Sequence, residues 1–101
     1  MEKIYISALL DVYGSFLSSK QRLLMEQYYN DDLSLSEIAE NEGITRQGVS
    51  DNLKRAEAKL RRWEKELGYC DSFLKLKALS AKARGGDKKA IDEICSIIDD
   101  L

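Results

Sequence analysis

A short run of polar residues at helical spacing has the side chains that read base pairs in DNA: Arg46, Gln47, Ser50 and Lys54. Arginine and glutamine make paired hydrogen bonds to guanine and adenine edges, and serine and lysine suit bases or phosphates. More basic residues continue along the same segment, where they would add affinity for a phosphate backbone: Arg55, Lys59, Arg61 and Arg62. The segment therefore predicts contact with nucleic acid.

The preceding residues supply the elements that would position this surface. Ser34, with Glu37 three residues later, is a capping box for a short helix that ends at Gly43, and Thr45 caps the next helix. Ala39 is the small residue that allows two helices of a helix-turn-helix to cross closely. The pattern predicts a helix-turn-helix. The alternative is that these residues only build a three-helix core whose outer face is solvated.

Two further helices are predicted before this motif. Apolar residues at three-and-four spacing, from Ile4 to Phe16, predict a first helix with Phe16 on its inward stripe. Ser18, with Gln21 three residues later, predicts a second helix that ends near Asn30 and Asp31.

The helix that begins after Thr45 is predicted to run on to Gly68, because one apolar stripe continues through it: Val49, Leu53, Ala56, Leu60, Trp63 and Leu67. This length has two interpretations. Within one chain the stripe would cover the first and last helices. Between chains it would form a homodimer interface at Leu60, Trp63 and Leu67, with help from the C-terminal helices.

The C-terminal third predicts two more helices, at "DSFLKLKALSAKA" and, after the Gly85-Gly86 break, from Asp87 to Leu101. The chain has no proline, six glycines and 34% charged residues, a profile of long helices. We predict an all-α fold in a single domain, 1–101. The helix-turn-helix core spans about 18–55, and the long helix and C-terminal helices span about 56–101.

Composition argues against an enzyme. Histidine is absent and no nucleotide-binding or nucleophile motif is present, so we predict no catalytic residue, no metal site and no cofactor. Cys70 and Cys95 have no metal-like spacing and are expected to be reduced thiols. The N-terminus resembles neither a signal peptide nor a membrane span, which favours a cytoplasmic protein without membrane insertion.

Charge opposes the nucleic-acid interpretation. The net charge is −2. Residues 26–42 contain six acidic and no basic residues, whereas residues 44–65 contain seven basic and three acidic ones, a net charge of +4. The basic segment could follow a phosphate backbone, and the acidic one would resist it.

Three stretches resemble one known family over nearly the whole chain: "LLDVYGSFLSSKQR", "YYNDDLSLSEIAE" and "ITRQGVSDNLKR". They are similar to the YlxM family of small helix-turn-helix proteins, encoded beside signal recognition particle genes in Gram-positive bacteria. The run from "LSSKQR" to "AEAKL" also resembles region 4 of bacterial sigma factors. The resemblance to the YlxM family implies a regulatory or accessory role in the signal recognition particle pathway.

The sequence departs from the family pattern at two positions. Glu42 stands where an apolar residue is usual, which predicts looser packing or an outward carboxylate. Gly48 stands where alanine is common, which costs the helix about 1 kcal/mol in propensity.

Two functions follow from these observations. One is a helix-turn-helix regulator of double-stranded DNA. The other is an adapter that binds a protein or RNA component of the signal recognition particle and no DNA.

Overall fold

The structure, a computed structural model, describes residues 2–101 and contains only helices, turns and connecting segments over that range. The prediction of an all-α fold is confirmed. The elements, in chain order, are α1 (Glu2–Tyr13), the short 3-10 helix η1 (Gly14–Phe16), α2 (Ser19–Tyr29), α3 (Leu35–Glu42), α4 (Arg46–Leu67), α5 (Tyr69–Arg84) and α6 (Lys88–Asp99).

The chain divides into two compact units, Met1–Leu67 and Gly68–Leu101. We call the first the N-terminal unit and the second the C-terminal hairpin. All of α4 belongs to the N-terminal unit. The division therefore falls at Gly68. The prediction of a single domain with a helix-turn-helix core at about 18–55 stays a prediction.

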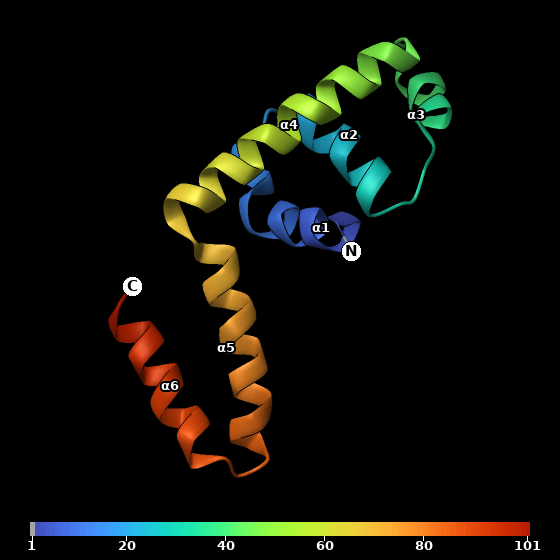
Figure 1. The fold of residues 1–101 in the computed structure, drawn as a ribbon. Helices are drawn as coiled ribbons and strands as arrows, with labels where there is room; N and C mark the ends of the chain where they lie inside the picture. Colours follow the sequence, from blue (N-terminus) through green and yellow to red (C-terminus); the bar gives the residue numbers. More distant parts are fainter. Residues whose placement is uncertain (1) are drawn as a thin grey trace. The chain divides into compact units, whose positions relative to one another are not determined.

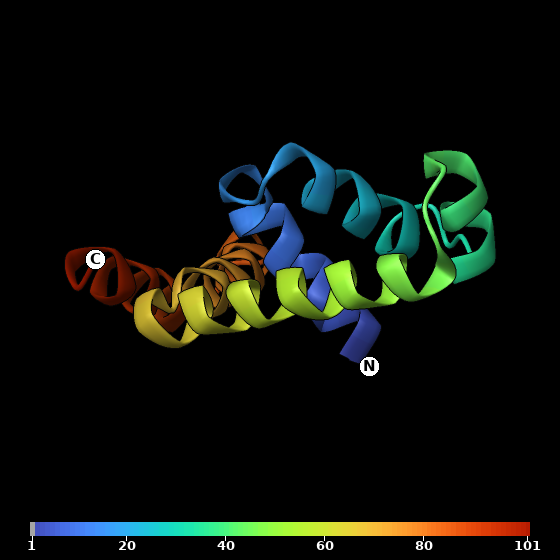
Figure 2. The same cartoon turned by 90° about the horizontal axis from the view of Figure 1, so that it is seen from above.

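Helix α4 is the element on which the N-terminal unit is built. Helices α1, α2 and α3 all contact it, and Figures 1 and 2 show α3 beside its N-terminal end. The inward stripe of α4 is buried as predicted over its first four positions, and it packs with fully buried residues of the other helices: Val49, Leu53, Ala56 and Leu60 against Ile6, Leu9, Tyr13, Leu24, Met25 and Ile38. Burial of this apolar surface holds the unit together.

The predicted helix starts are confirmed by their capping hydrogen bonds. The Ser18 hydroxyl accepts from the Gln21 backbone N–H at 3.1 Å, and Ser34 and Glu37 form a reciprocal capping box at 3.1 Å each. Thr45 Oγ1 accepts from the Gly48 N–H at 2.9 Å. Each cap satisfies a backbone donor that the first turn of a helix leaves free.

The prediction for the end of the first helix was wrong. Helix α1 stops at Tyr13, and residues 14–16 form η1 instead of a further α-helical turn. The tighter turn breaks the α-helical spacing. As a result Phe16 is 69% exposed, and Leu17 takes the buried position.

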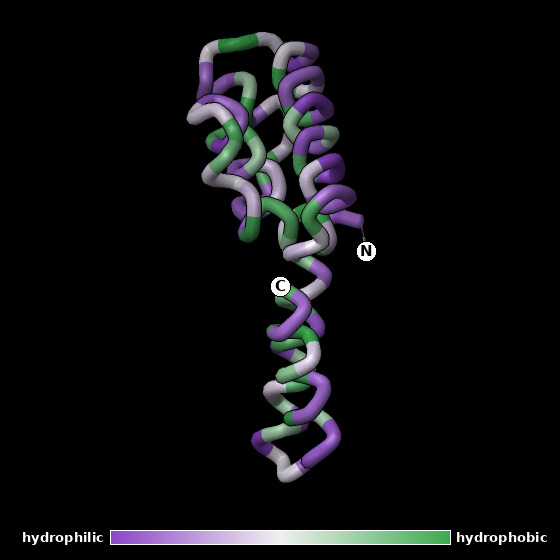
Figure 3. The backbone as a smooth tube through the Cα atoms, turned by 90° about the vertical axis from the view of Figure 1, so that its left-hand side faces the viewer, coloured by the Kyte–Doolittle hydropathy of each residue, from purple (hydrophilic) through white to green (hydrophobic). Residues whose placement is uncertain are grey.

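The C-terminal hairpin consists of α5 and α6, which contact each other along their length. Asp87 caps α6, since its carboxylate accepts from the Lys89 and Ala90 N–H groups. Hydrophobic and hydrophilic residues alternate along both helices (Figure 3). Cys70, Leu79 and Ala90 are buried, whereas a larger apolar set is exposed: Tyr69, Phe73, Leu74, Ile91, Ile98 and Leu101.

Candidate nucleic-acid interface

The helix-turn-helix consists of α3, the turn at residues 43–45 and the first half of α4. Gly43 ends α3 in the left-handed conformation, with φ of 64°, and the Ile44 N–H donates to the Ala39 carbonyl at 3.1 Å. A residue with a side chain is strained at this φ, so glycine suits the turn. Ile38 and Val49 are fully buried and join the two helices.

A buried amide fixes α3 against α2. Gln27 is only 7% exposed. Its Nε2 donates to Glu42 Oε2 and its Oε1 accepts from Asn41 Nδ2, both at 3.2 Å. Glu42, where the sequence predicted looser packing or an outward carboxylate, is therefore a half-buried acceptor. The last turn of α3 is bonded to α2 on both sides of the Gln27 amide.

The first half of α4 presents its polar residues outward. Arg46, Gln47, Lys54 and Arg55 are exposed, and Ser50 is half-buried nearer to the core. Opposite them lie the buried Val49 and Leu53. The packing of the inner face thus determines which side chains a groove would meet.

Of the six basic residues in the predicted site, four make no hydrogen bond or ion pair with any residue in the described range 2–101: Arg46, Lys54, Arg55 and Arg62. All four are exposed. We call this set the unpaired bases. Charged groups that need not break an internal contact are the ones most readily available to phosphates or base edges.

Two other basic residues of the predicted site have intramolecular partners. Lys59 donates to Gln21 Oε1 at 3.1 Å. Arg61 is bonded to Glu57, at 3.1 and 3.2 Å, and to Glu2. Lys59 and Arg61 thus connect α4 to α2 and α1, so their charged groups are less available to a phosphate than those of the unpaired bases.

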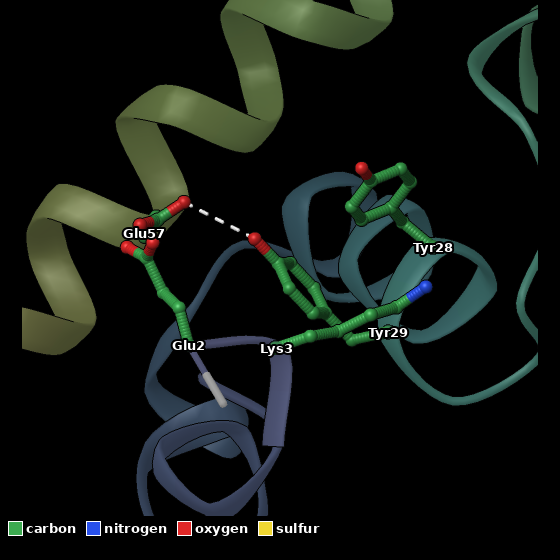
Figure 4. Close-up of a pocket in the computed structure, with 5 residues that line it drawn as sticks. All are labelled: Glu2, Lys3, Tyr28, Tyr29 and Glu57. Atoms are coloured by element: carbon green, nitrogen blue, oxygen red, sulfur yellow. Dashed lines mark hydrogen bonds between the residues drawn. The ribbon is translucent and has the colours of Figure 1, made fainter. Parts of the chain in front are cut away.

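The flank of α4 that bears Arg61 is occupied by contacts within the unit. The Tyr29 hydroxyl donates to Glu57 Oε2 at 3.1 Å, as Figure 4 shows. Burial, followed by the nearby carboxylate of Glu57, raises the pKa of the Tyr29 hydroxyl above its ordinary range. Glu57 thus accepts from two side chains and holds α2 and Arg61 together.

The three residues predicted as a dimer interface differ in position. Leu60 is fully buried in the N-terminal unit, so its assignment to a surface is corrected. Trp63 is half-buried against Tyr13 and Phe16, with ring centroids 6.3 and 6.1 Å away. Leu67 is 47% exposed at the end of α4. Leu67 and the outer side of Trp63 are the parts that a partner could reach.

Internal contacts also involve most acidic residues of 26–42. Glu26 forms an ion pair with Arg22, and Asp32 forms one with Lys3, which lowers the pKa of Asp32. Asp31 and Glu40 are exposed and make no side-chain hydrogen bond or ion pair with residues 2–101.

Residues 1–97 match the protein family described as "Putative helix-turn-helix protein, YlxM / p13 like". The chain belongs to this family. A UPF0122 protein of Acetivibrio thermocellus is 49% identical over 78 residues, which cover 76% of this chain and 67% of that protein. One from Shouchella clausii is 41% identical over 93 residues, 90% of this chain and 85% of the relative. One from Desulforamulus reducens is 50% identical over 68 residues, 67% of this chain but only 58% of the relative.

Membership in a helix-turn-helix family agrees with the geometry of α3 and α4, and the resemblance seen in the sequence is confirmed. The family description names a fold motif and no catalytic activity. None of the described helices is long and apolar enough to cross a membrane.

Two residues of the site were missed in the sequence. Gln27 gave no signal, because its partners lie 14 and 15 positions away. Asp51 was not part of the predicted site, yet it accepts from Gln47 Nε2 at 2.9 Å. The spacing of four between Gln47 and Asp51 is a known helical pair and could have identified this contact.

Proposed function

We propose that this protein is a DNA-binding regulator of the cytoplasm that docks the first half of α4 in the major groove. The supporting observation is the set of unpaired bases on the outward face of a helix whose inner face is fixed by buried residues. In a helix-turn-helix, the second helix enters the groove and the first crosses the backbone.

The residues divide by role. Arg46, Gln47, Ser50 and Lys54 face base edges or the nearest phosphates. Arg55 and Arg62 add phosphate contacts. Lys59 and Arg61 are omitted from this surface, since they bond within the unit.

Two neighbouring arginines provide a matched experiment. Arg62→Ala and Arg61→Ala remove the same charge from adjacent positions of α4, but only Arg61 has partners among the described residues. Fluorescence anisotropy with a labelled duplex would be measured across a salt series. We expect Arg62→Ala to lower the slope of log K against log salt by about 1.

The control should behave differently. Arg61→Ala should leave the slope unchanged and lower the urea midpoint, because it breaks contacts to α1 and within α4. Equal slopes for wild type and both variants would contradict phosphate contact by Arg62. No binding by wild type at low salt would contradict DNA binding altogether.

Recognition of the DNA base sequence by Arg46 is tested separately. Arg46→Ala should lose about 1–3 kcal/mol for a selected duplex while leaving binding to random competitor nearly unchanged. A loss shared equally by both duplexes would reduce Arg46 to a phosphate contact.

The exposed acids favour a second candidate, an adapter for the signal recognition particle. Glu40 lies on α3 of the helix-turn-helix and Asp31 lies just before that helix, and both would repel a nucleic-acid backbone. A protein that binds no duplex at low salt but retains a purified protein or RNA component of the particle would support the adapter.

We also propose a homodimer that buries Leu67 and the outer side of Trp63, together with apolar residues of the hairpin. Leu67→Glu should shift sedimentation velocity toward the monomer. Leu23→Glu is the control, because Leu23 is similarly exposed, at 43%, but lies on α2. A wild type that sediments as a monomer at all concentrations would refute this dimer.

A further inference from the structure

One side-chain pair lies on the outward face of α4, within the surface proposed to meet DNA. Gln47 Nε2 donates to Asp51 Oδ1 at 2.9 Å, one helical turn further along. A carboxylate accepts hydrogen bonds and donates none, so the bond fixes which end of the Gln47 amide faces Asp51. The NH₂ group faces the carboxylate, and the carbonyl oxygen remains available.

The groups left over on Gln47 match one base edge. Adenine presents an N6 donor and an N7 acceptor in the major groove, and glutamine meets them with its oxygen and one N–H. That N–H is the one on the same side of the amide as the oxygen. The other N–H is free to bond Asp51, so the two contacts do not compete.

Asp51 itself has no need to touch a base. It is half-buried and lines a shallow hollow with Lys54 and Arg55. These two cations lie beside the carboxylate and offset part of the repulsion that it would exert on a phosphate.

We propose that Asp51 is a positioning residue that orients the Gln47 amide to read an adenine, and that it thereby sets the sequence preference at one base pair. This inference rests on the proposed DNA-binding function. The competing explanation is that the pair only supports the helix, because a glutamine–aspartate pair four residues apart stabilises a helix slightly.

The test is a selection from a random duplex library with the full chain in four forms: wild type, Gln47→Ala, Asp51→Ala and Asp51→Asn. Asparagine retains an oxygen acceptor at position 51 and removes the charge, so it separates orientation from electrostatics. Urea unfolding of each variant checks that all four are folded.

We expect the wild type to select a site with adenine at one defined position. Gln47→Ala and Asp51→Ala should both reduce that preference by about fivefold or more, the low end for one paired base contact, and at the same position. Asp51→Asn should restore it.

Other outcomes overturn the inference. If Asp51→Ala keeps the adenine preference, Asp51 does not orient Gln47. If Asp51→Ala and Asp51→Asn both bind every duplex more tightly and lose the preference equally, the effect of Asp51 is one of charge. If the wild type binds duplexes but Gln47→Ala selects the same site, Gln47 reads no base. If the wild type selects no site and binds no duplex, the proposed function fails together with the inference.

Discussion

Replacing Gln27 with methionine tests the contact that fixes the scaffold helix of the helix-turn-helix. Methionine retains most of the buried volume but removes both hydrogen bonds, one to the Glu42 carboxylate and one from the Asn41 amide. A hydrogen bond to a charged group is worth about 1.5–3 kcal/mol and a neutral one about 0.5–1.5 kcal/mol. Asn41 is exposed and Glu42 half-buried, so both regain water. We therefore expect a net loss of about 1–2 kcal/mol.

Tryptophan fluorescence can measure this loss of stability. Trp63 is the single tryptophan of the chain, and it packs on Tyr13 and Phe16 in the N-terminal unit. Fluorescence therefore reports unfolding of that unit. The urea midpoint should fall with an unchanged slope, and the melting temperature should fall by about 4–8 °C per kcal/mol for a unit of this size.

A double-mutant cycle separates the Gln27–Glu42 bond from packing. Glu42→Ala removes the acceptor, and the double variant Gln27→Met with Glu42→Ala should be more stable than the sum of the single losses implies, by about 0.5 kcal/mol or more. Gln21→Met is the control. It makes the same replacement at a second buried glutamine, whose hydrogen-bond partner Lys59 lies on α4. Additive losses, or a Gln27→Met midpoint equal to that of wild type, would refute the reasoning.

Substitutions at three further positions test the turn, the start of α4 and an α2–α4 contact. Gly43→Ala should destabilise the protein by about 1–2 kcal/mol and Gly43→Asn by less, measured by urea unfolding, because the positive φ alone strains a side chain there. Gly48→Ala should change stability by less than the helix propensity gain of about 1 kcal/mol, since its Cβ would lie 3.1 Å from Thr45 Oγ1. Tyr29 has a raised pKa, so folding stability should fall as pH rises above the ordinary tyrosine value of about 10, where only the unfolded chain loses this proton. Tyr29→Phe should remove that part of the alkaline loss in denaturant titrations at pH 9–11.

The features that were predicted correctly depend on short stretches of sequence. Capping bonds join residues three apart, as at Ser18 and Thr45, and the turn needs one glycine at position 43. Periodicity placed the inward stripe of α4 because the spacing follows from helix geometry alone.

The features that were missed depend on distant contacts. Arg61 and Glu2 are separated by 59 positions and Lys59 and Gln21 by 38. The local sequence around Arg61 contains Glu57 four residues earlier but gives no sign of the bond to Glu2, and Arg62 beside it is unpaired. Phe16 was misplaced for another reason: a 3-10 turn changed the residue spacing that the prediction assumed.

The acidic composition and the proposed DNA contact can be reconciled by where each charge lies. Net charge governs solubility and long-range attraction, but at physiological salt a charge acts over only about 8 Å. Of the six acids in residues 26–42, Glu26 and Asp32 are paired with basic residues from outside that segment. Helix α3, which would cross the DNA backbone, carries the exposed Glu37 and Glu40. These two acids oppose the unpaired bases at the contact itself. Under the proposed function, such a surface would bind DNA with modest affinity that falls steeply with salt, and the proposed groove contacts of Arg46 and Gln47 would decide which sequence is bound.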